Sequence, residues 1–174
     1  MTDMARDESA LCLACGLCCQ GPLFSWAVLQ PDELAHAETL PVVMVDREDA
    51  LGFRLPCACF RDMHCTVYDE RFQVCRDFAC QLLLRLRNDQ VSQAEALELV
   101  RQARELVQEI EDHLPPDEAE RVWDRIGKRW DLKDLQPLLV SGQIEPDTLM
   151  AIVSLDVHLE RHFHHPKVAP DDAP

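Results

Sequence analysis

Several features are absent from this 174-residue sequence, and each absence disfavours a class of protein. No apolar run approaches the roughly 20 residues that a membrane-spanning helix needs. The first ten residues, MTDMARDESA, are acidic, whereas a secretory signal begins basic and then turns apolar. Basic residues are scarce, because 17 lysines and arginines stand against 32 acids and give a formal net charge of −15. We therefore expect a cytoplasmic protein that binds neither nucleic acid nor a membrane, since both present negative charge.

Glycine is also rare, and several catalytic motifs are missing. The chain has five glycines, no glycine-rich nucleotide or S-adenosylmethionine loop and no His-Glu-x-x-His pair. These absences disfavour methyl transfer and zinc-protease chemistry, and no residue is assigned a catalytic role. The hydrophobic fraction of 47% is nevertheless enough for a sizeable buried core.

Cysteine, in contrast, is abundant and confined to one half of the chain. All nine cysteines lie at or before Cys80. A reducing cytosol keeps thiols reduced, and an odd number of cysteines suits a disulfide framework poorly. Metal ligation is therefore the leading hypothesis for these residues.

Four of the cysteines fall within the eight residues CLACGLCC, at the positions Cys12, Cys15, Cys18 and Cys19. The two overlapping Cys-x2-Cys turns can each deliver two sulfur atoms to an ion, and Gly16 can supply a positive φ between them. The C-x2-C-x2-C spacing also occurs at iron–sulfur clusters, although the Cys-Pro that completes those motifs is absent here. Adjacent side chains point to opposite sides of an extended backbone, so the last two cysteines would serve two metals, or one of them would lie beside a site.

The second group of cysteines is spread more widely, from residue 57 to residue 80. The combined pattern C-x2-C-x2-C-C, then C-x(n)-C-x2-Y-x2-R-x3-C-R-x-F-x-C, resembles that of the YkgJ-type cysteine-cluster proteins, which are described as zinc- or iron-chelating domains. The resemblance covers roughly residues 12 to 80. The resemblance implies eight metal ligands, namely Cys12, Cys15, Cys18, Cys19, Cys57, Cys65, Cys75 and Cys80. It also implies that three residues lie beside these ligands, namely Tyr68, Arg71 and Arg76.

Two residues depart from the family pattern. Phe72 follows the arginine where the family has proline, so the backbone there either turns differently or continues as the first turn of a helix. Cys59 is additional, and we expect it to be a spare thiol, with Cys57 as the ligand and the reverse assignment as the alternative.

Three hypotheses account for the cysteines. The chain binds zinc through thiolates, it is a redox protein with an iron–sulfur cluster, or it is a metal-free protein that cycles between dithiol and disulfide. Arginines near thiolates would balance their negative charge, and the tyrosine would pack against the ligand loop. His64, beside Cys65, and the helical pair His158 and His162 are outside candidates for mixed ligation.

The expected fold is mainly α. Residues 1–91 would form a cysteine-rich metal-binding lobe with little strand, residues 92–165 a helical segment packed on it, and residues 166–174 a disordered tail. Apolar spacing predicts helices over 31–38, 72–88, 92–114, 116–130, 134–140 and 146–163, and a strand over 40–46. The apolar residues expected to face inward on the helices of the second half include Leu97, Val122, Trp123 and Val157. The helical segment would support the lobe or form a homodimer surface, and the partner is otherwise expected to be an unidentified protein.

Overall fold

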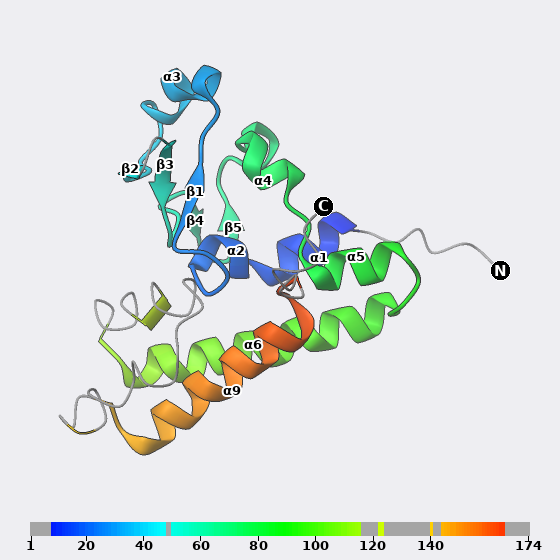
Figure 1. Ribbon diagram of the computed structural model, residues 1–174. Coiled ribbons are helices and arrows are strands. Elements are labelled where there is room, and N and C mark those ends of the chain that lie inside the picture. Colours follow the sequence, from blue (N-terminus) through cyan, green and yellow to red (C-terminus); the bar gives the residue numbers. More distant parts are fainter. Residues whose placement is uncertain (1–7, 48–49, 116–121, 124–139, 141–143, 166–174) are drawn as a thin grey trace, which may run out of the picture.

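The computed structural model describes residues 8–47, 50–115, 122–123, 140 and 144–165. Two long antiparallel helices, α6 (Gln93–His113) and α9 (Pro146–His162), lie side by side in one layer (Figure 1). Helices α1 (Glu8–Cys15) and α5 (Gln81–Arg87) pack over α6, and the short strands and helices of the remaining N-terminal half lie beyond them. The described residues thus form a mainly α structure with short strands, as predicted.

Helix α6 begins and ends as its sequence predicts. The Ser92 Oγ accepts a hydrogen bond from the Glu95 amide at 3.2 Å, and the Glu95 carboxylate accepts one from the Ser92 amide at 2.8 Å. Its apolar residues at helical spacing are buried, namely Ala96, Val100, Ala103, Val107 and Ile110. Leu97 was expected on the same face but is 37% exposed, because it is rotated by about 100° from its buried neighbour.

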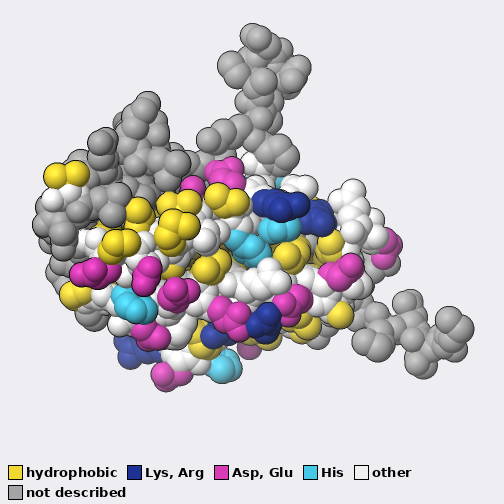
Figure 2. All heavy atoms as spheres, turned by 90° about the horizontal axis from the view of Figure 1, so that it is seen from below, with side chains coloured by type: hydrophobic (Ala, Val, Ile, Leu, Met, Phe, Trp, Pro, Cys, Tyr) yellow, Lys and Arg dark blue, Asp and Glu magenta, His cyan; other side chains and the backbone are white. Residues whose placement is uncertain are grey.

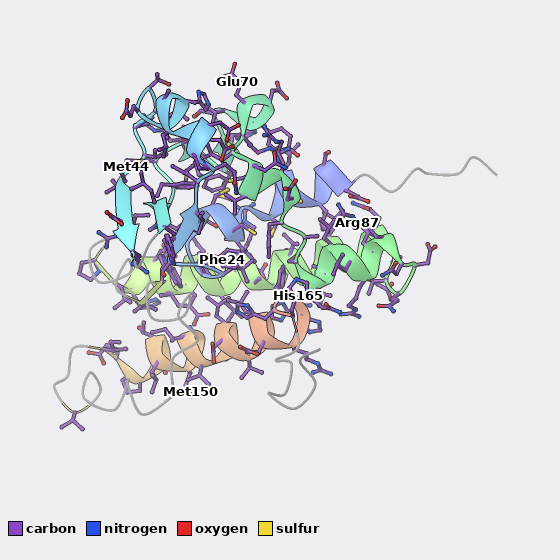
Figure 3. The ribbon with its side chains drawn as sticks, turned by 45° about the horizontal axis from the view of Figure 1, so that its top comes forward. Phe24, Met44, Glu70, Arg87, Met150 and His165 are labelled. Carbon is purple, nitrogen blue, oxygen red and sulfur yellow. The ribbon has the colours of Figure 1, made fainter. Side chains whose placement is uncertain are left out.

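Helix α9 also confirms its predicted span. Ile152, Leu155 and Leu159 are fully buried. Val157 was expected to be buried but is 59% exposed, because the apolar residues of α9 extend around more of the helix than α6 covers. Met150 likewise lies on the outer side of α9 (Figure 3).

Other predictions for the helical segment fall largely outside the described residues. These are the helices over 116–130 and 134–140 and the disordered tail over 166–174. Val122 and Trp123, predicted to face inward, are described and are 4% and 2% exposed.

The N-terminal half contains more strand than predicted. Three strands, β1 (Trp26–Val28), β2 (Met44–Arg47) and β3 (Ala50–Arg54), form an antiparallel sheet with β3 in the centre. Only β2 was expected, since β1 is too short to show alternation and β3 is interrupted by Gly52. The predicted helix over 31–38 is a 3-10 turn, η1 (Pro31–Glu33), followed by α3 (Leu34–Ala37).

Two shorter strands form a tight hairpin. Strands β4 (Phe60–Arg61) and β5 (His64–Cys65) are joined by Asp62 and Met63, whose φ angles of 47° and 64° suit a two-residue hairpin turn. A 3-10 turn, η2 (Tyr68–Glu70), follows the hairpin.

The helix predicted over 72–88 is divided in two, so that prediction was wrong in its continuity. Helix α4 (Gln73–Asp77) ends at Phe78, whose backbone is extended, and α5 starts after Cys80. The Phe78 ring packs edge-to-face on Phe24 at 4.7 Å between centroids, and this tertiary contact accompanies the break in the helix. The Cys80 Sγ then caps α5 by accepting a hydrogen bond from the Leu83 amide at 3.5 Å.

Two buried clusters support these elements. The larger one joins α1, α5, α6 and α9. The smaller one lies under the three-stranded sheet and contains the tilted ring pair Phe53 and Phe72, whose centroids are 5.0 Å apart. The face seen from the α9 side carries scattered acidic side chains, with histidine beside basic side chains at one end (Figure 2). Within the part of the chain that is described, no helix combines the length and apolarity needed to cross a bilayer.

Candidate metal centre

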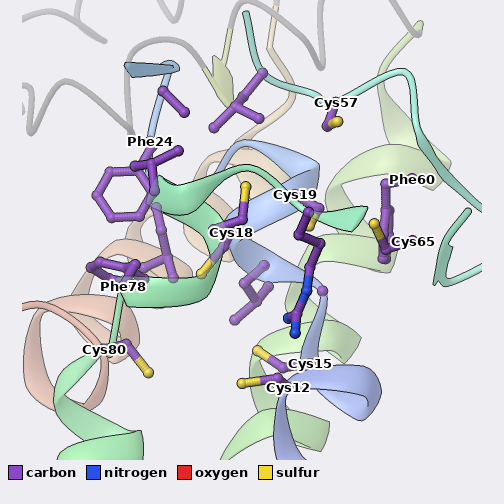
Figure 4. Close-up of a pocket in the computed structure, with 18 of the residues that line it drawn as sticks. Cys12, Cys15, Cys18, Cys19, Phe24, Cys57, Phe60, Cys65, Phe78 and Cys80 are labelled. Carbon is purple, nitrogen blue, oxygen red and sulfur yellow. The ribbon is translucent and has the colours of Figure 1, made fainter. Parts of the chain in front are cut away.

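All nine cysteines line one cavity of about 350 Å³. They come from segments that are far apart in sequence and meet at one place in the fold (Figure 4). Every one of them is a free thiol. Most of the remaining lining is apolar, and its aromatic residues include Phe24, Phe53, Phe60, Phe72 and Phe78.

The first segment is helical except at one residue. Cys12 and Cys15 lie on α1, Gly16 adopts φ +68°, and α2 (Leu17–Gln20) carries Cys18 and Cys19. The positive φ was predicted, whereas the turn and extended conformations expected for the cysteines were not found. A Cβ atom at Gly16 would overlap the Cζ atom of Phe60, so the glycine lets the β4 aromatic ring pack against the backbone here.

Backbone hydrogen bonds attach the second segment to the first. The Cys57 amide donates to the Cys19 carbonyl at 2.8 Å. The Thr66 amide and hydroxyl both donate to the Cys59 carbonyl, at 2.8 and 3.0 Å. These bonds hold the loop of Cys57 and the β5 strand of Cys65 close to α2.

The third segment is fixed by the end of α9. Cys75 lies on α4, and Cys80 immediately precedes α5. The Gln81 amide donates to the Phe163 carbonyl at 2.9 Å, and His165 Nε2 donates to the Ala79 carbonyl at 2.9 Å. The helical layer therefore contacts the backbone on both sides of Cys80.

Electrostatic neighbours divide eight of the thiols into two groups. Burial, together with the nearby Cys80 and Cys12 thiols, raises the pKa of Cys15 to about 12. Burial also raises the pKa of Cys18 well above its ordinary value, with Cys15 and Cys80, then Cys19 and Cys12, as further causes. In Figure 4 the sulfur atoms of Cys12 and Cys15 lie side by side, on the side of the cavity that also holds Cys80. We call Cys12, Cys15, Cys18 and Cys80 the first thiol set.

The second thiol set is Cys19, Cys57, Cys65 and Cys75. Burial raises the pKa of Cys19 to about 12, with Cys57, Cys65 and Cys75 as the next causes. Burial raises the pKa of Cys57 to about 12, with Cys59, Cys75 and Cys65 as further causes, and it raises the pKa of Cys75 to about 11, with Cys65 as the next cause. The adjacent residues 18 and 19 thus have mainly different neighbours, because successive side chains of a helix diverge by about 100°.

The chemistry of these donors fits a thiophilic metal. Among the described residues, no group of three or more cysteine, histidine, aspartate or glutamate side chains is arranged so that it could hold a metal ion. A change of χ1 rotamer moves a cysteine sulfur by roughly 3 Å, so the separation of the sulfur atoms depends on the rotamer that each thiol adopts. Cysteine sulfurs in an apolar cavity suit zinc, iron and iron–sulfur centres, whereas Mg²⁺ and Ca²⁺ prefer oxygen ligands.

The residues expected beside the ligands are close to them. Arg71 lines the cavity, and its guanidinium carbon lies 3.5 Å from the centroid of the Tyr68 ring. Arg76 donates hydrogen bonds to the Arg71 carbonyl and to the Gln73 side chain. Both arginines oppose the rise in the pKa of Cys75 that burial causes.

The ninth thiol, Cys59, is 2% exposed and also lines the cavity. Burial raises its pKa, and a hydrogen bond with the Cys57 side chain opposes that rise. The two candidates for one ligand position are therefore direct neighbours.

None of the described histidines lines the cavity. His64 Nδ1 donates to the Asp62 carbonyl at 2.7 Å on the exposed hairpin. The His158 and His162 rings lie 4.8 Å apart, but His158 Nε2 donates to the Leu99 carbonyl and Arg85 donates to His162 Nδ1. An arginine beside this pair disfavours a cation there.

Sequence reasoning missed the aromatic lining, and Phe60 in particular. The available signal was the glycine between the two Cys-x2-Cys turns, which indicates a close approach but does not say from which strand. No protein-family model matches the chain, and no curated protein or solved structure is significantly similar to it.

Proposed function

We propose that this chain is a metal-binding protein in which the first and second thiol sets each hold one metal centre. The observation that supports this most strongly is the convergence of all nine cysteines on one apolar cavity. Buried thiols with raised pKa values are protonated near neutral pH, and a thiophilic cation that displaces the protons would stabilise the thiolates. Residue 18 would belong to one centre and residue 19 to the other.

A specific observation also supports iron–sulfur redox chemistry as a second candidate. Four sulfurs around one zinc ion are about 3.8 Å apart, given a tetrahedron with Zn–S of about 2.3 Å. The thiols here surround a cavity of about 350 Å³. Among the described residues they are not grouped closely enough to hold a single ion. A polynuclear cluster needs space of this kind between its cysteine ligands. The C-x2-C-x2-C spacing of the first thiol set, completed by the distant Cys80, is compatible with a cluster.

The experiment compares single serine variants of Cys18 and Cys19, which are adjacent in sequence but belong to different thiol sets. Cys18→Ser should lose the first centre and keep the second, and Cys19→Ser should do the reverse, so each retains about half of the wild-type metal. Cys59→Ser is the matched control, since Cys59 is a buried cysteine of the same cavity that the sequence pattern leaves as a spare thiol, and this variant should retain both centres. Metal content, acid-labile sulfide and the absorption spectrum would be measured on protein purified without oxygen.

The outcomes separate the hypotheses. A broad band near ~400 nm with labile sulfide selects iron–sulfur clusters, and colourless protein with about two zinc ions selects zinc. Equal metal content in the Cys18, Cys19 and Cys59 variants would contradict the two-centre proposal.

A further inference from the structure

One charged side chain, that of Arg71, lies among the described residues that line the nine-cysteine cavity. The remaining lining consists of the thiols, a tyrosine, a glycine and apolar side chains. A cation in such surroundings interacts strongly with any negative charge that forms there, because the local dielectric constant is lower than that of water.

Arg71 is held in place from two directions. Its guanidinium stacks on the Tyr68 ring at 3.5 Å, and its Nε donates to the Tyr68 carbonyl at 2.7 Å. Its own carbonyl accepts a hydrogen bond from Arg76. Among the described residues, the hydrogen bond that the Arg71 side chain donates comes from Nε, so Nη1 and Nη2 can donate to thiolates.

The position of Arg71 relates it to both thiol sets. Arg71 lines the cavity that all eight thiols of the two sets also line. Consistent with this position, its guanidinium opposes the rise that burial causes in the pKa of Cys12, a member of the first set, and of Cys75, a member of the second. Arg76 and Arg61, by comparison, do not line this cavity.

Two filled sites would repel each other. A divalent ion with four thiolates carries a formal charge of −2, and consecutive Cα atoms are about 3.8 Å apart. Because residues 18 and 19 would ligate different ions, the two negative centres cannot be far from each other. A cation near both would reduce this repulsion and attract each centre.

We propose that Arg71 is a positioning residue that couples the two metal sites, its stacked guanidinium favouring the state in which both thiol sets are loaded. The inference rests on the proposed function and specifies how the two sites depend on each other. It predicts that Arg71 changes the ratio of the two stepwise binding constants more than it changes the first constant.

The test is a titration of the full-length, metal-free, reduced chain with Co²⁺, whose thiolate complexes absorb in the visible range, followed by displacement with Zn²⁺. Wild type, Arg71→Gln and Arg71→Lys would be compared. We expect Arg71→Gln to weaken the second ion about tenfold or more relative to the first, within the usual range of coupling between sites. Arg71→Lys should recover part of this loss, because it keeps the charge but not the planar, stacked group.

Arg61 provides the matched control. Arg61→Gln removes a cation that neighbours Cys59 but does not line the cavity. This variant should not alter the ratio of the two constants as Arg71→Gln does. An unchanged ratio in Arg71→Gln, or the same change in Arg61→Gln, overturns the coupling role.

The design separates this inference from the proposed function and from misfolding. A wild-type chain that takes up no Co²⁺ refutes the proposed function, whereas a wild-type chain that takes up two ions with an unaltered ratio in Arg71→Gln refutes only the inference. If circular dichroism shows that the metal-free Arg71→Gln chain is unfolded, Tyr68→Leu becomes the test variant. This substitution removes the ring on which the Arg71 guanidinium stacks but keeps the arginine charge. The ratio should then fall in the same direction, and an unchanged ratio there overturns the inference.

Discussion

Replacement of Gly16 by alanine tests how the structure holds the first four cysteines. The residue has φ +68°, a conformation that costs a residue with a Cβ atom about 1–2 kcal/mol. The new methyl group would also overlap the Phe60 ring, and forced repacking of this kind costs about 1–3 kcal/mol. We therefore expect Gly16→Ala to lower the free energy of unfolding by about 2–5 kcal/mol.

The assay is urea unfolding of the reduced, metal-free protein, followed by far-ultraviolet circular dichroism. A cycle with Phe60→Leu separates the two contributions, because the smaller side chain removes the overlap and leaves the backbone cost. In the Phe60→Leu background the same glycine substitution should cost only about 1–2 kcal/mol. A Gly16→Ala protein within about 0.5 kcal/mol of wild type, or an equal cost in both backgrounds, would refute the packing described for this turn.

The helical layer gives three further predictions. Ser92→Ala should lower stability by about 1 kcal/mol in urea unfolding, because it removes the N-cap of α6, and an unchanged midpoint would contradict the cap. Leu159→Ala should lower the free energy of unfolding by about 2–5 kcal/mol, since the Leu159 side chain is fully buried. Val157→Ala, on the exposed side of the same helix, should change it by no more than about 0.5 kcal/mol. Similar losses in the two variants would show that α9 is oriented differently. Burial, and then the neighbouring His158, lower the pKa of His162 below its ordinary 6.5, so the unfolded state binds the proton more readily and stability should fall as pH drops below about 6.5. The loss should be smaller in His162→Gln, and parallel pH profiles of the two proteins would contradict this assignment.

The long helices were predictable because local chemistry and tertiary packing agree there. The Ser92–Glu95 capping box and the regular apolar spacing of α6 specify its start and its buried face without knowledge of the partner. The buried face of α9 was harder to assign, because Val157 is as apolar as its buried neighbours and only the position of α6 decides which side is covered.

The N-terminal half was less predictable because its structure depends on contacts between distant segments. The break between α4 and α5 accompanies the packing of Phe78 on Phe24, which no local pattern indicates. The cysteine pattern singled out eight of the nine thiols that line the cavity and left Cys59 as a spare. The grouping of Cys18 and Cys19 with mainly different neighbours required the three-dimensional arrangement.

Native mass spectrometry of the chain purified without oxygen measures directly whether the folded protein carries metal. We expect a mass above that of the polypeptide by two metal centres, with the excess lost when the chain is unfolded in the presence of a chelator. The bare polypeptide mass, together with alkylation of all nine thiols in the folded protein, would contradict it.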